Sequence, residues 1–167
     1  MTSPYTLLKT AVFTVVVPGT VVELVPRVLA RYDRESPTLD SPAARTVGKL
    51  SLIAGGLLYL YTALQFSTEG DGTPAPNDEP ATLVTGGVYA YTRNPMYVGV
   101  VLLLGGQAVR FKSLHVLWWT LVCWLGFHRR ILEYEEPHLL EKHGDAYAEY
   151  CERVPRWFPD PRSLEND

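Results

Sequence analysis

MYVGVVLLLGGQAVRFKSLHVLWWTLVCWLGF, residues 96–127, places two apolar runs on either side of the short basic turn RFK. Each run, residues 96–109 and 114–127, has about 14 residues, whereas a helix needs roughly 20 to cross the hydrocarbon core of a bilayer. The pattern predicts a helical hairpin. Its two helices can reach membrane length only if they continue into the polar sequence at the open end.

The open end of this hairpin holds the unusual polar residues of the chain: TRNPMY precedes the first run and HRRILEYEE follows the second. A helix over residues 113–136 would be about 36 Å long at 1.5 Å per residue, so its polar end would stand clear of the hydrocarbon. The hairpin then brings two separated groups of side chains together. The first group is Arg93, Asn94 and Tyr97, and the second is Arg129, Arg130, Glu135 and Glu136.

The first apolar run begins with favourable signals for a helix start. Pro95 suits the first helical position, and Asn94 is a good N-cap. The exposed backbone N–H groups and the positive dipole end at such a start favour an anion. Gly86 and Gly87 predict a turn shortly before it. An ordinary capped helix behind a turn is the alternative to a binding site here.

Two further apolar blocks lie in the N-terminal half, at residues 7–30 and 47–66, and each is long enough to cross a bilayer. Glu23 is unusual inside the first block, because a carboxylate within a bilayer is costly. It is either a functional or paired group, or a residue near the membrane interface. In the second block, Gly55 and Gly56 permit close approach of a neighbouring helix.

Polar sequence flanks the hairpin on both sides. STEGDGTPAPNDEP, residues 67–80, is acidic and rich in Gly and Pro, which predicts an exposed loop. After Glu136, apolar residues recur at helical spacing with a break near Gly144. This pattern predicts a helical segment that lies on the membrane surface or folds over the open end of the hairpin. The apolar stripe consists of Leu139, Leu140, His143, Tyr147, Tyr150 and Val154.

Together these elements predict one all-α domain, an integral membrane helical bundle of about four transmembrane helices. The whole chain, residues 1–167, forms this domain. Its parts are two N-terminal helices in 1–66, a loop in 67–95, the helical hairpin in 96–136, and a surface-lying segment in 137–167.

Composition excludes several functions. A formal net charge of -3 gives no basic footprint, so nucleic acid is not expected as a partner. Cys123 lies in an apolar run and Cys151 in a polar tail, which favours two reduced thiols over a disulfide. The four histidines show no spacing that is typical of metal ligands, so no metal site is expected.

Two motifs resemble those of the isoprenylcysteine carboxyl methyltransferase family and its phospholipid methyltransferase relatives. They are LVTGGVYAYTRNPMYVG, residues 83–99, and EYEEPHLLEKHGDAYAEYCERVPRWFP, residues 133–159, with the hairpin between them. The resemblance covers roughly residues 81–159. It implies that S-adenosylmethionine binds at the cytosolic end of the helices, and the lack of a GxGxxG motif after a strand agrees with this.

Carried over residue by residue, the resemblance implies a cofactor site. Glu135 would accept hydrogen bonds from the ribose hydroxyls or the ammonium group of the cofactor. The expected cofactor-binding residues are Ala81, Thr82, Leu83, Val84, Tyr89, Arg93, Asn94, Pro95, Met96, Tyr97 and Glu135.

The expected catalytic residues are Arg129, Arg130 and Glu136. Either arginine would position an anionic acceptor, and Glu136 would assist deprotonation of an amine acceptor. The alternative for the two arginines is a salt-bridged helix end that also includes Glu133.

The sequence departs from the family pattern at two positions. The family often has His before the Pro, and this chain has Asn94, which can cap and hydrogen-bond but cannot titrate. Members that methylate prenylcysteine carry a substrate-binding Arg shortly before the Glu pair, and that column falls on Ile131, one place from Arg130. The second departure weakens the case for prenylcysteine as the acceptor.

The predicted function is methyl transfer from S-adenosylmethionine to a lipophilic acceptor in the membrane, either an isoprenylcysteine-like carboxylate or a lipid head group. The expected partners are this small molecule and the lipid bilayer of the cell membrane. We place the cofactor site in the cytoplasm, where the cofactor is found, although basic residues in the first loop argue nearly equally for the reverse. The alternatives are an NADPH-dependent reductase of an isoprenoid or sterol-like lipid, and a non-enzymatic membrane protein.

Overall fold

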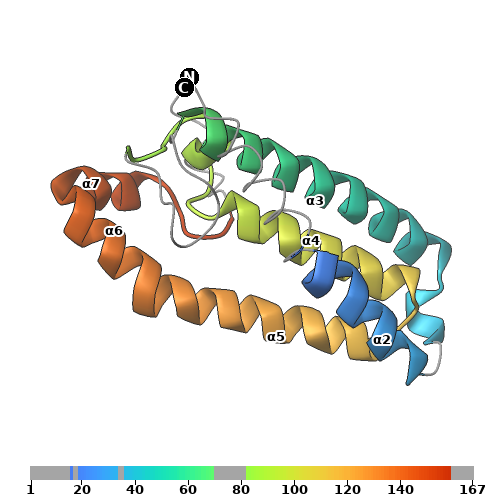
Figure 1. The fold of residues 1–167 in the computed structure, drawn as a ribbon. Helices are drawn as coiled ribbons and strands as arrows, with labels where there is room; N and C mark the ends of the chain where they lie inside the picture. The colour runs from blue at the N-terminus through green and yellow to red at the C-terminus, as the bar shows by residue number, and fades with distance from the viewer. Residues whose placement is uncertain (1–15, 17–18, 34–35, 70–81, 159–167) are drawn as a thin grey trace.

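The computed structural model describes residues 16, 19–33, 36–69 and 82–158, and every regular element among them is helical (Figure 1). The all-α fold class is therefore confirmed for this part of the chain. The α-helices are α2 (Val25–Arg31), α3 (Pro42–Glu69), α4 (Pro95–Arg110), α5 (Leu114–Arg130), α6 (Glu136–His143) and α7 (Asp145–Arg153). Short π-helical and 3-10 segments join them: η1 (Gly19–Leu24), η2 (Pro37–Leu39), η3 (Gly87–Ala90) and η4 (Ile131–Glu135).

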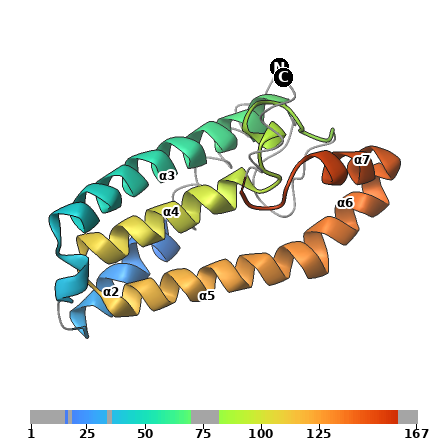
Figure 2. The same cartoon turned by 180° about the vertical axis from the view of Figure 1, so that it is seen from behind.

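Helices α3 and α4 run antiparallel and pack closely along a seam of glycines (Figure 2). A Cβ atom added at Gly55 would lie 2.7 Å from the carbonyl oxygen of Gly99, and one added at Gly99 would lie 3.0 Å from that of Gly55. Seven residues away on each helix, a Cβ atom added at Gly106 would lie 2.9 Å from the carbonyl oxygen of Gly48. The predicted close approach at Gly55 is confirmed, whereas Gly56 has room for a side chain, because its nearest neighbour is 4.0 Å away.

The hairpin predicted for residues 96–127 is present. Helix α4 begins at Pro95, the chain turns at Phe111 and Lys112, and Ser113 caps α5 by accepting a hydrogen bond from the Val116 N–H. Helical structure then continues through η4 into α6, which is longer than the predicted helix ending at residue 136. The hairpin therefore has one closed end at the turn and one open end.

The segment η1–α2 lies against α4 and α5 toward the closed end. Trp119 donates a hydrogen bond from its indole N–H to the Val21 carbonyl at 3.2 Å. Glu23 contacts Arg27 and Gln107 and lies 3.5 Å from Arg110. Glu23 is thus a paired group, one of the alternatives considered above. Much of the predicted first apolar block lies outside the described residues.

One helix in the described part of the chain, at Pro42–Gln65 within α3, is long and apolar enough to cross a membrane. Helix α4 is apolar but shorter. About four crossings were expected, and the described residues supply one of full length. The loop prediction from residue 67 was wrong at its start, because α3 continues to Glu69; residues 70–80 lie outside the described residues. Large apolar side chains on α3 remain exposed, among them Val47, Leu50, Ile53, Leu57, Leu60 and Leu64.

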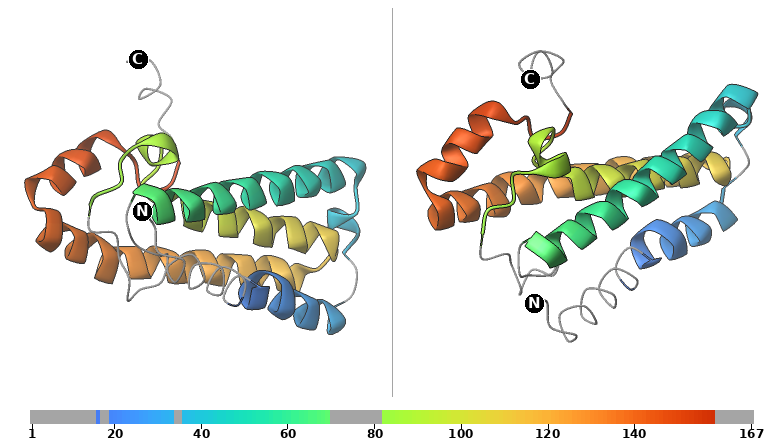
Figure 3. Two further views of the ribbon diagram at one scale, coloured as in Figure 1. Left: turned by 45° about the horizontal axis from the view of Figure 1, so that its top comes forward. Right: turned by 90° about the horizontal axis from the view of Figure 1, so that it is seen from above.

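Helices α6 and α7 fold back from α5 toward the start of α4 (Figure 3). The break between them is at Gly144, whose φ of +56° is a conformation that favours glycine. Tyr147, Tyr150 and Val154 are buried and pack with Leu83. The segment therefore folds over the open end of the hairpin, as one of the two predicted arrangements has it. Leu140 does not share this burial, since 49% of its surface is exposed.

Candidate active site

Residues just before α4 are tied to the backbone that follows α7. The Arg93 N–H donates to the Pro155 carbonyl at 3.0 Å, and the Asn94 side-chain amide donates to the Arg156 carbonyl at 3.0 Å. The Thr92 hydroxyl donates to the same carbonyl at 3.2 Å, across 64 positions of sequence. The two motifs predicted to meet at the open end of the hairpin are therefore in direct contact.

The Asn94 side chain does not cap α4 as predicted. It occupies the N-cap position of α4, but its side chain makes no capping hydrogen bond. With φ of −130° and ψ of 51°, its amide instead reaches the Arg156 carbonyl. The predicted capping function was wrong because a tertiary partner, which sequence cannot place, competes for the side chain.

Glu136 joins the same two segments through an ionic cluster. Its carboxylate lies 3.0 Å from Arg93 and accepts hydrogen bonds from Arg156 at 2.7 and 2.9 Å. The cluster is largely screened from water, because the Arg93 and Glu136 side chains are 11% and 19% exposed. Burial raises the pKa of Glu136, but the hydrogen bond from Arg156 and the charges of Arg93 and Arg156 outweigh it, so the pKa is lowered.

A carboxylate held in this way stays ionised at neutral pH and is a poor proton acceptor. Glu136 therefore suits a role in fixing Arg93 and Arg156 better than the expected role of assisting deprotonation. Arg93 also donates to the Cys151 sulfur at 2.7 Å. Its Nε–H is buried and has no hydrogen-bond partner among the described residues.

Glu135, the neighbouring residue, faces α4. Its Oε1 accepts a hydrogen bond from the Tyr97 hydroxyl at 2.5 Å and another from Arg130 Nε at 2.7 Å. The Tyr97 ring stacks on Phe127, with ring centroids 4.6 Å apart. Because residues five apart align in a π-helical turn, η4 brings Arg130 and Glu135 onto one side. This arrangement forms a half-buried cluster of a phenol, a carboxylate and a guanidinium.

Arg129 lies apart from this cluster. It forms an ion pair with Glu133 one helical turn away, at 2.8 Å, and the two side chains are 76% and 61% exposed. Arg129 and Glu133 thus match the salt-bridged helix end considered above. Of the two arginines expected to position an acceptor, only Arg130 contacts another expected site residue within the described structure.

The remaining expected cofactor residues surround these two clusters. Tyr89 is buried and its carbonyl accepts a hydrogen bond from the Tyr150 hydroxyl at 2.7 Å. Burial raises the pKa of Tyr89, so its phenol stays neutral. Pro95 is buried, and Met96 packs against the main apolar core. Leu83 and Val84 are half-buried and Thr82 is exposed, whereas Ala81 lies outside the described residues.

Sequence reasoning gave no site role to Arg156, Trp157 or Tyr150. Arg156 supplies the second cation of the Glu136 cluster. Trp157 donates from its indole N–H to Nδ1 of His128 at 3.1 Å and lies beside Trp124. The signal was available in VPRWF, residues 154–158, where a cation and two aromatics follow directly on the apolar stripe. Only the contacts formed in the folded chain show that these residues lie beside Glu136 and His128.

Known proteins share parts of this architecture. The family described as phospholipid methyltransferase matches residues 44–146, from the first turn of α3 to the start of α7. The chain belongs to the phospholipid methyltransferase family. This family region contains both acidic partners, Glu135 and Glu136, and the glycine seam, but it ends before Arg156.

Relatives with printed functions match shorter parts of the chain. A protein-S-isoprenylcysteine O-methyltransferase from Schizosaccharomyces pombe is 41% identical over 78 residues, covering 46% of this chain and 33% of its own. Its counterpart from Homo sapiens is 37% identical over 87 residues, covering 52% and 30%. The chain thus spans about a third of the length of these curated relatives.

A solved structure matches the fold over a longer region. It is described as a eukaryotic intramembrane Ras methyltransferase, isoprenylcysteine carboxyl methyltransferase. The TM-score is 0.62 and the identity 27%, and the match covers 84% of this chain and 51% of that one. The family resemblance drawn from the two sequence motifs is confirmed.

Proposed function

We propose that this protein is an integral membrane methyltransferase that uses S-adenosylmethionine to methylate a lipophilic acceptor. The observation that carries the proposal is the contact between the motif around Asn94 and Tyr97 and the pair Glu135 and Glu136 at the open end of an apolar hairpin. Family membership and the methyltransferase relatives support the same conclusion.

The side chains at this end fit the cofactor chemically. Glu135 offers a carboxylate that can accept from ribose hydroxyls or an ammonium group, and the half-buried Tyr97 offers an aromatic ring for adenine or a sulfonium, with the buried Tyr89 beneath the site. The buried Nε–H of Arg93, which has no partner in the described part of the chain, is a donor suited to a carboxylate. The start of α4, at Pro95, adds the positive end of a helix dipole.

The chemistry supplied by the cofactor is an electrophilic methyl group on a sulfonium. The protein has to align an acceptor with that group and exclude water, and good positioning is worth about 7–11 kcal/mol of the barrier. Arg130 is the cation placed to orient an anionic acceptor, with Glu135 fixing its guanidinium. Helices α6 and α7 cover the site from the aqueous side, and Glu136 keeps them attached through Arg93 and Arg156.

The membrane arrangement follows from the same assignment. We place α3 and the hairpin in the bilayer, with about four crossings in the whole chain and the cofactor site facing the cytoplasm. The cofactor enters from the water beneath α6 and α7, and the acceptor enters sideways from the lipid. An isoprenylcysteine-like carboxylate and a lipid head group are the two acceptor classes that this geometry serves, because both combine an anionic or polar group with apolar chains.

Cofactor binding is the most direct test. The purified full chain is titrated with S-adenosylmethionine by calorimetry, and NADPH is titrated in parallel. We expect saturable binding of S-adenosylmethionine alone, and incubation with labelled cofactor and membrane lipids should yield an extractable labelled lipid. Binding of NADPH alone would favour a reductase, and binding of neither ligand would favour a non-enzymatic protein.

Glu135→Ala tests the assigned site. We expect at least a tenfold weaker affinity for S-adenosylmethionine with a small change in the thermal midpoint, because the half-buried Glu135 carboxylate contacts the side chains of Tyr97 and Arg130. Glu133→Ala is the matched control, since it removes an exposed carboxylate two residues away. An unchanged dissociation constant in Glu135→Ala would remove this residue from the cofactor site.

A further inference from the structure

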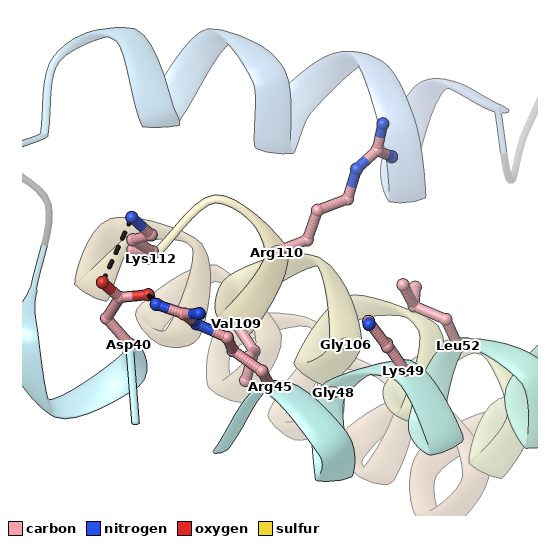
Figure 4. Close-up of a pocket in the computed structure, with 9 residues that line it drawn as sticks. All are labelled: Asp40, Arg45, Gly48, Lys49, Leu52, Gly106, Val109, Arg110 and Lys112. Atoms are coloured by element: carbon pink, nitrogen blue, oxygen red, sulfur yellow. Dashed lines mark hydrogen bonds and ion pairs between the residues drawn. The ribbon is translucent and has the colours of Figure 1, made fainter. Parts of the chain in front are cut away.

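A basic hollow lies at the closed end of the bundle, at the other end of α4 from the candidate active site (Figure 4). It has a volume of about 380 Å³ and lies between the first turns of α3 and the last turns of α4. The glycine seam forms part of its wall at Gly48 and Gly106, where the helix backbones approach closely. Helix α4 has 16 residues, so the two sites are separated by roughly 24 Å along its axis.

The hollow carries an excess of positive charge. Four cations and one carboxylate line it: Arg45, Lys49, Arg110, Lys112 and Asp40. Counted together, these groups give a net charge of +3. Asp40 accepts a hydrogen bond from Arg45 at 2.8 Å and lies 3.3 Å from Lys112.

The other two cations are not neutralised within the hollow. Arg110 is 3.5 Å from Glu23, but that carboxylate also contacts Arg27, so this second group adds no net negative charge. Lys49 is exposed and forms no ion pair with any residue that the structure describes. Lys49, one turn along α3 from Arg45, is therefore a cation that can attract an anion.

The surroundings of the hollow are apolar. Arg45 and Lys49 belong to the first two turns of α3, the one described helix of membrane length. Directly along that helix, the side chains of Leu50, Ile53 and Leu57 are 61%, 60% and 66% exposed. A hollow with apolar walls and cations at its edge therefore lies at the end of an exposed apolar face.

We propose that this hollow binds the head group of an anionic phospholipid, with its phosphate beside Arg45 and Lys49 and its acyl chains along the exposed face of α3. The charge excess selects an anion, and the hollow falls within the size of small-ligand sites, about 300–1,000 Å³. A soluble phosphate would satisfy the charges but would leave the adjoining apolar face uncovered. Basic pockets at a membrane boundary are suited to anionic head groups for this reason.

The inference also accounts for the charge distribution of the chain. Basic residues at this end nearly cancel the positive bias at the end that holds the candidate active site. A bound anionic lipid would neutralise these basic residues, which lie at the end that the proposed orientation places away from the cytoplasm. The lipid site does not participate in methyl transfer.

Lipid titration of the full chain in detergent tests the proposal. The probes are short-chain phosphatidylglycerol, short-chain phosphatidylcholine and glycerol phosphate, and the readouts are bound lipid by native mass spectrometry and the thermal midpoint. We expect phosphatidylglycerol to bind and to raise the midpoint, with the other two probes at least tenfold weaker. Equal binding of the two lipids would overturn the charge argument. Glycerol phosphate binding as tightly as the lipid would overturn the lipid assignment.

Charge-neutral variants localise the site. Lys49→Gln should weaken phosphatidylglycerol binding about fivefold. The double variant that also carries Arg45→Gln should weaken it about 25-fold, as expected for roughly 1 kcal/mol per cation near a membrane surface. Arg153→Gln, an exposed cation on α7, is the matched control and should bind lipid as the parent chain does. Equal losses in Lys49→Gln and Arg153→Gln would place the lipid elsewhere. Titration of S-adenosylmethionine on the same samples should be unchanged, so failure here is separable from failure of the proposed methyltransferase.

Discussion

The α3–α4 seam and the contacts that close the candidate active site are built from opposite kinds of interaction. In the seam, glycines let two helix backbones approach until the carbonyls of Gly55 and Gly99 face each other's Cα atoms. At the site, the same helix α4 is joined to the C-terminal segment by hydrogen bonds and ion pairs, from Arg93 to Pro155 and from Arg156 to Glu136.

This difference separates a permanent contact from one that can open. Close backbone packing is lost only when the helices move apart, and in an apolar environment it depends on dispersion contacts along the whole interface. A hydrogen bond at the site contributes about 1 kcal/mol net, because water replaces the lost partner when the contact opens. The seam is thus suited to holding the bundle together, and the polar contacts are suited to a cover that can open.

The largest expected effect is in the seam. Gly55→Ala should lower the free energy of unfolding by about 3 kcal/mol, near the upper end for overpacked sites, because the new methyl meets backbone atoms that no rotamer change can move. Gly56→Ala is the control on the same helix, and it should leave stability within about 0.5 kcal/mol, since its methyl has 4.0 Å of clearance. Thermal unfolding in detergent measures both. Equal midpoints for the two variants would show that the seam does not limit stability.

The next effect concerns the ionic cluster at the site. Glu136→Gln should cost about 2 kcal/mol, because it leaves two cations, Arg93 and Arg156, close together and poorly paired. Glu133→Gln removes an exposed pair with Arg129 and should cost less than about 1 kcal/mol. Hydrogen exchange should show the loss concentrated in α6 and α7. Uniform loss over α3 and α4 would contradict the separation of the two regions.

The stability that Glu136 contributes should depend on pH. The pKa of Glu136 is lowered in the fold from its ordinary value of 4.5, so its ionised form contributes stability that is fully present above that value. The contribution is lost as pH falls through the lowered pKa. The difference in thermal midpoint between the parent chain and Glu136→Gln should therefore be constant from pH 6 to pH 8 and shrink below roughly pH 4. A difference that stays constant down to about pH 3 would show that Glu136 is not ionised in the fold.

The two regions also differ in how far sequence could predict them. The hairpin and the meeting of its polar ends followed from the lengths of two apolar runs, because short helices must extend into polar sequence. The seam was partly visible: Gly55 was identified, but its partner Gly99 and the second level at Gly48 and Gly106 were not. Their seven-residue spacing places them on one face of each helix, and that signal is present in the sequence.

The details of the site depended on information that local sequence does not contain. The wide turn η4 rotates Arg130 toward Glu135, and an ordinary α-helical register does not give that alignment. Asn94 has the residue type of an N-cap and uses its amide elsewhere, because the Arg156 carbonyl lies within reach only in the folded chain. The sequence predicted which residues lie near one another at the site. It did not predict their hydrogen-bond partners across the fold.

The smallest expected effect separates the two neighbouring arginines. Arg130→Gln should reduce kcat/KM for methyl transfer at least tenfold, because it removes the cation held by Glu135 beside Tyr97. Arg129→Gln should change kcat/KM less than twofold and stability by less than about 0.5 kcal/mol, since an exposed ion pair one helical turn apart contributes little. Steady-state kinetics with labelled cofactor and a lipid acceptor measures both. Equal losses would mean that the exposed side of α5 also contacts the acceptor. The site would then extend beyond Arg130 to include Arg129.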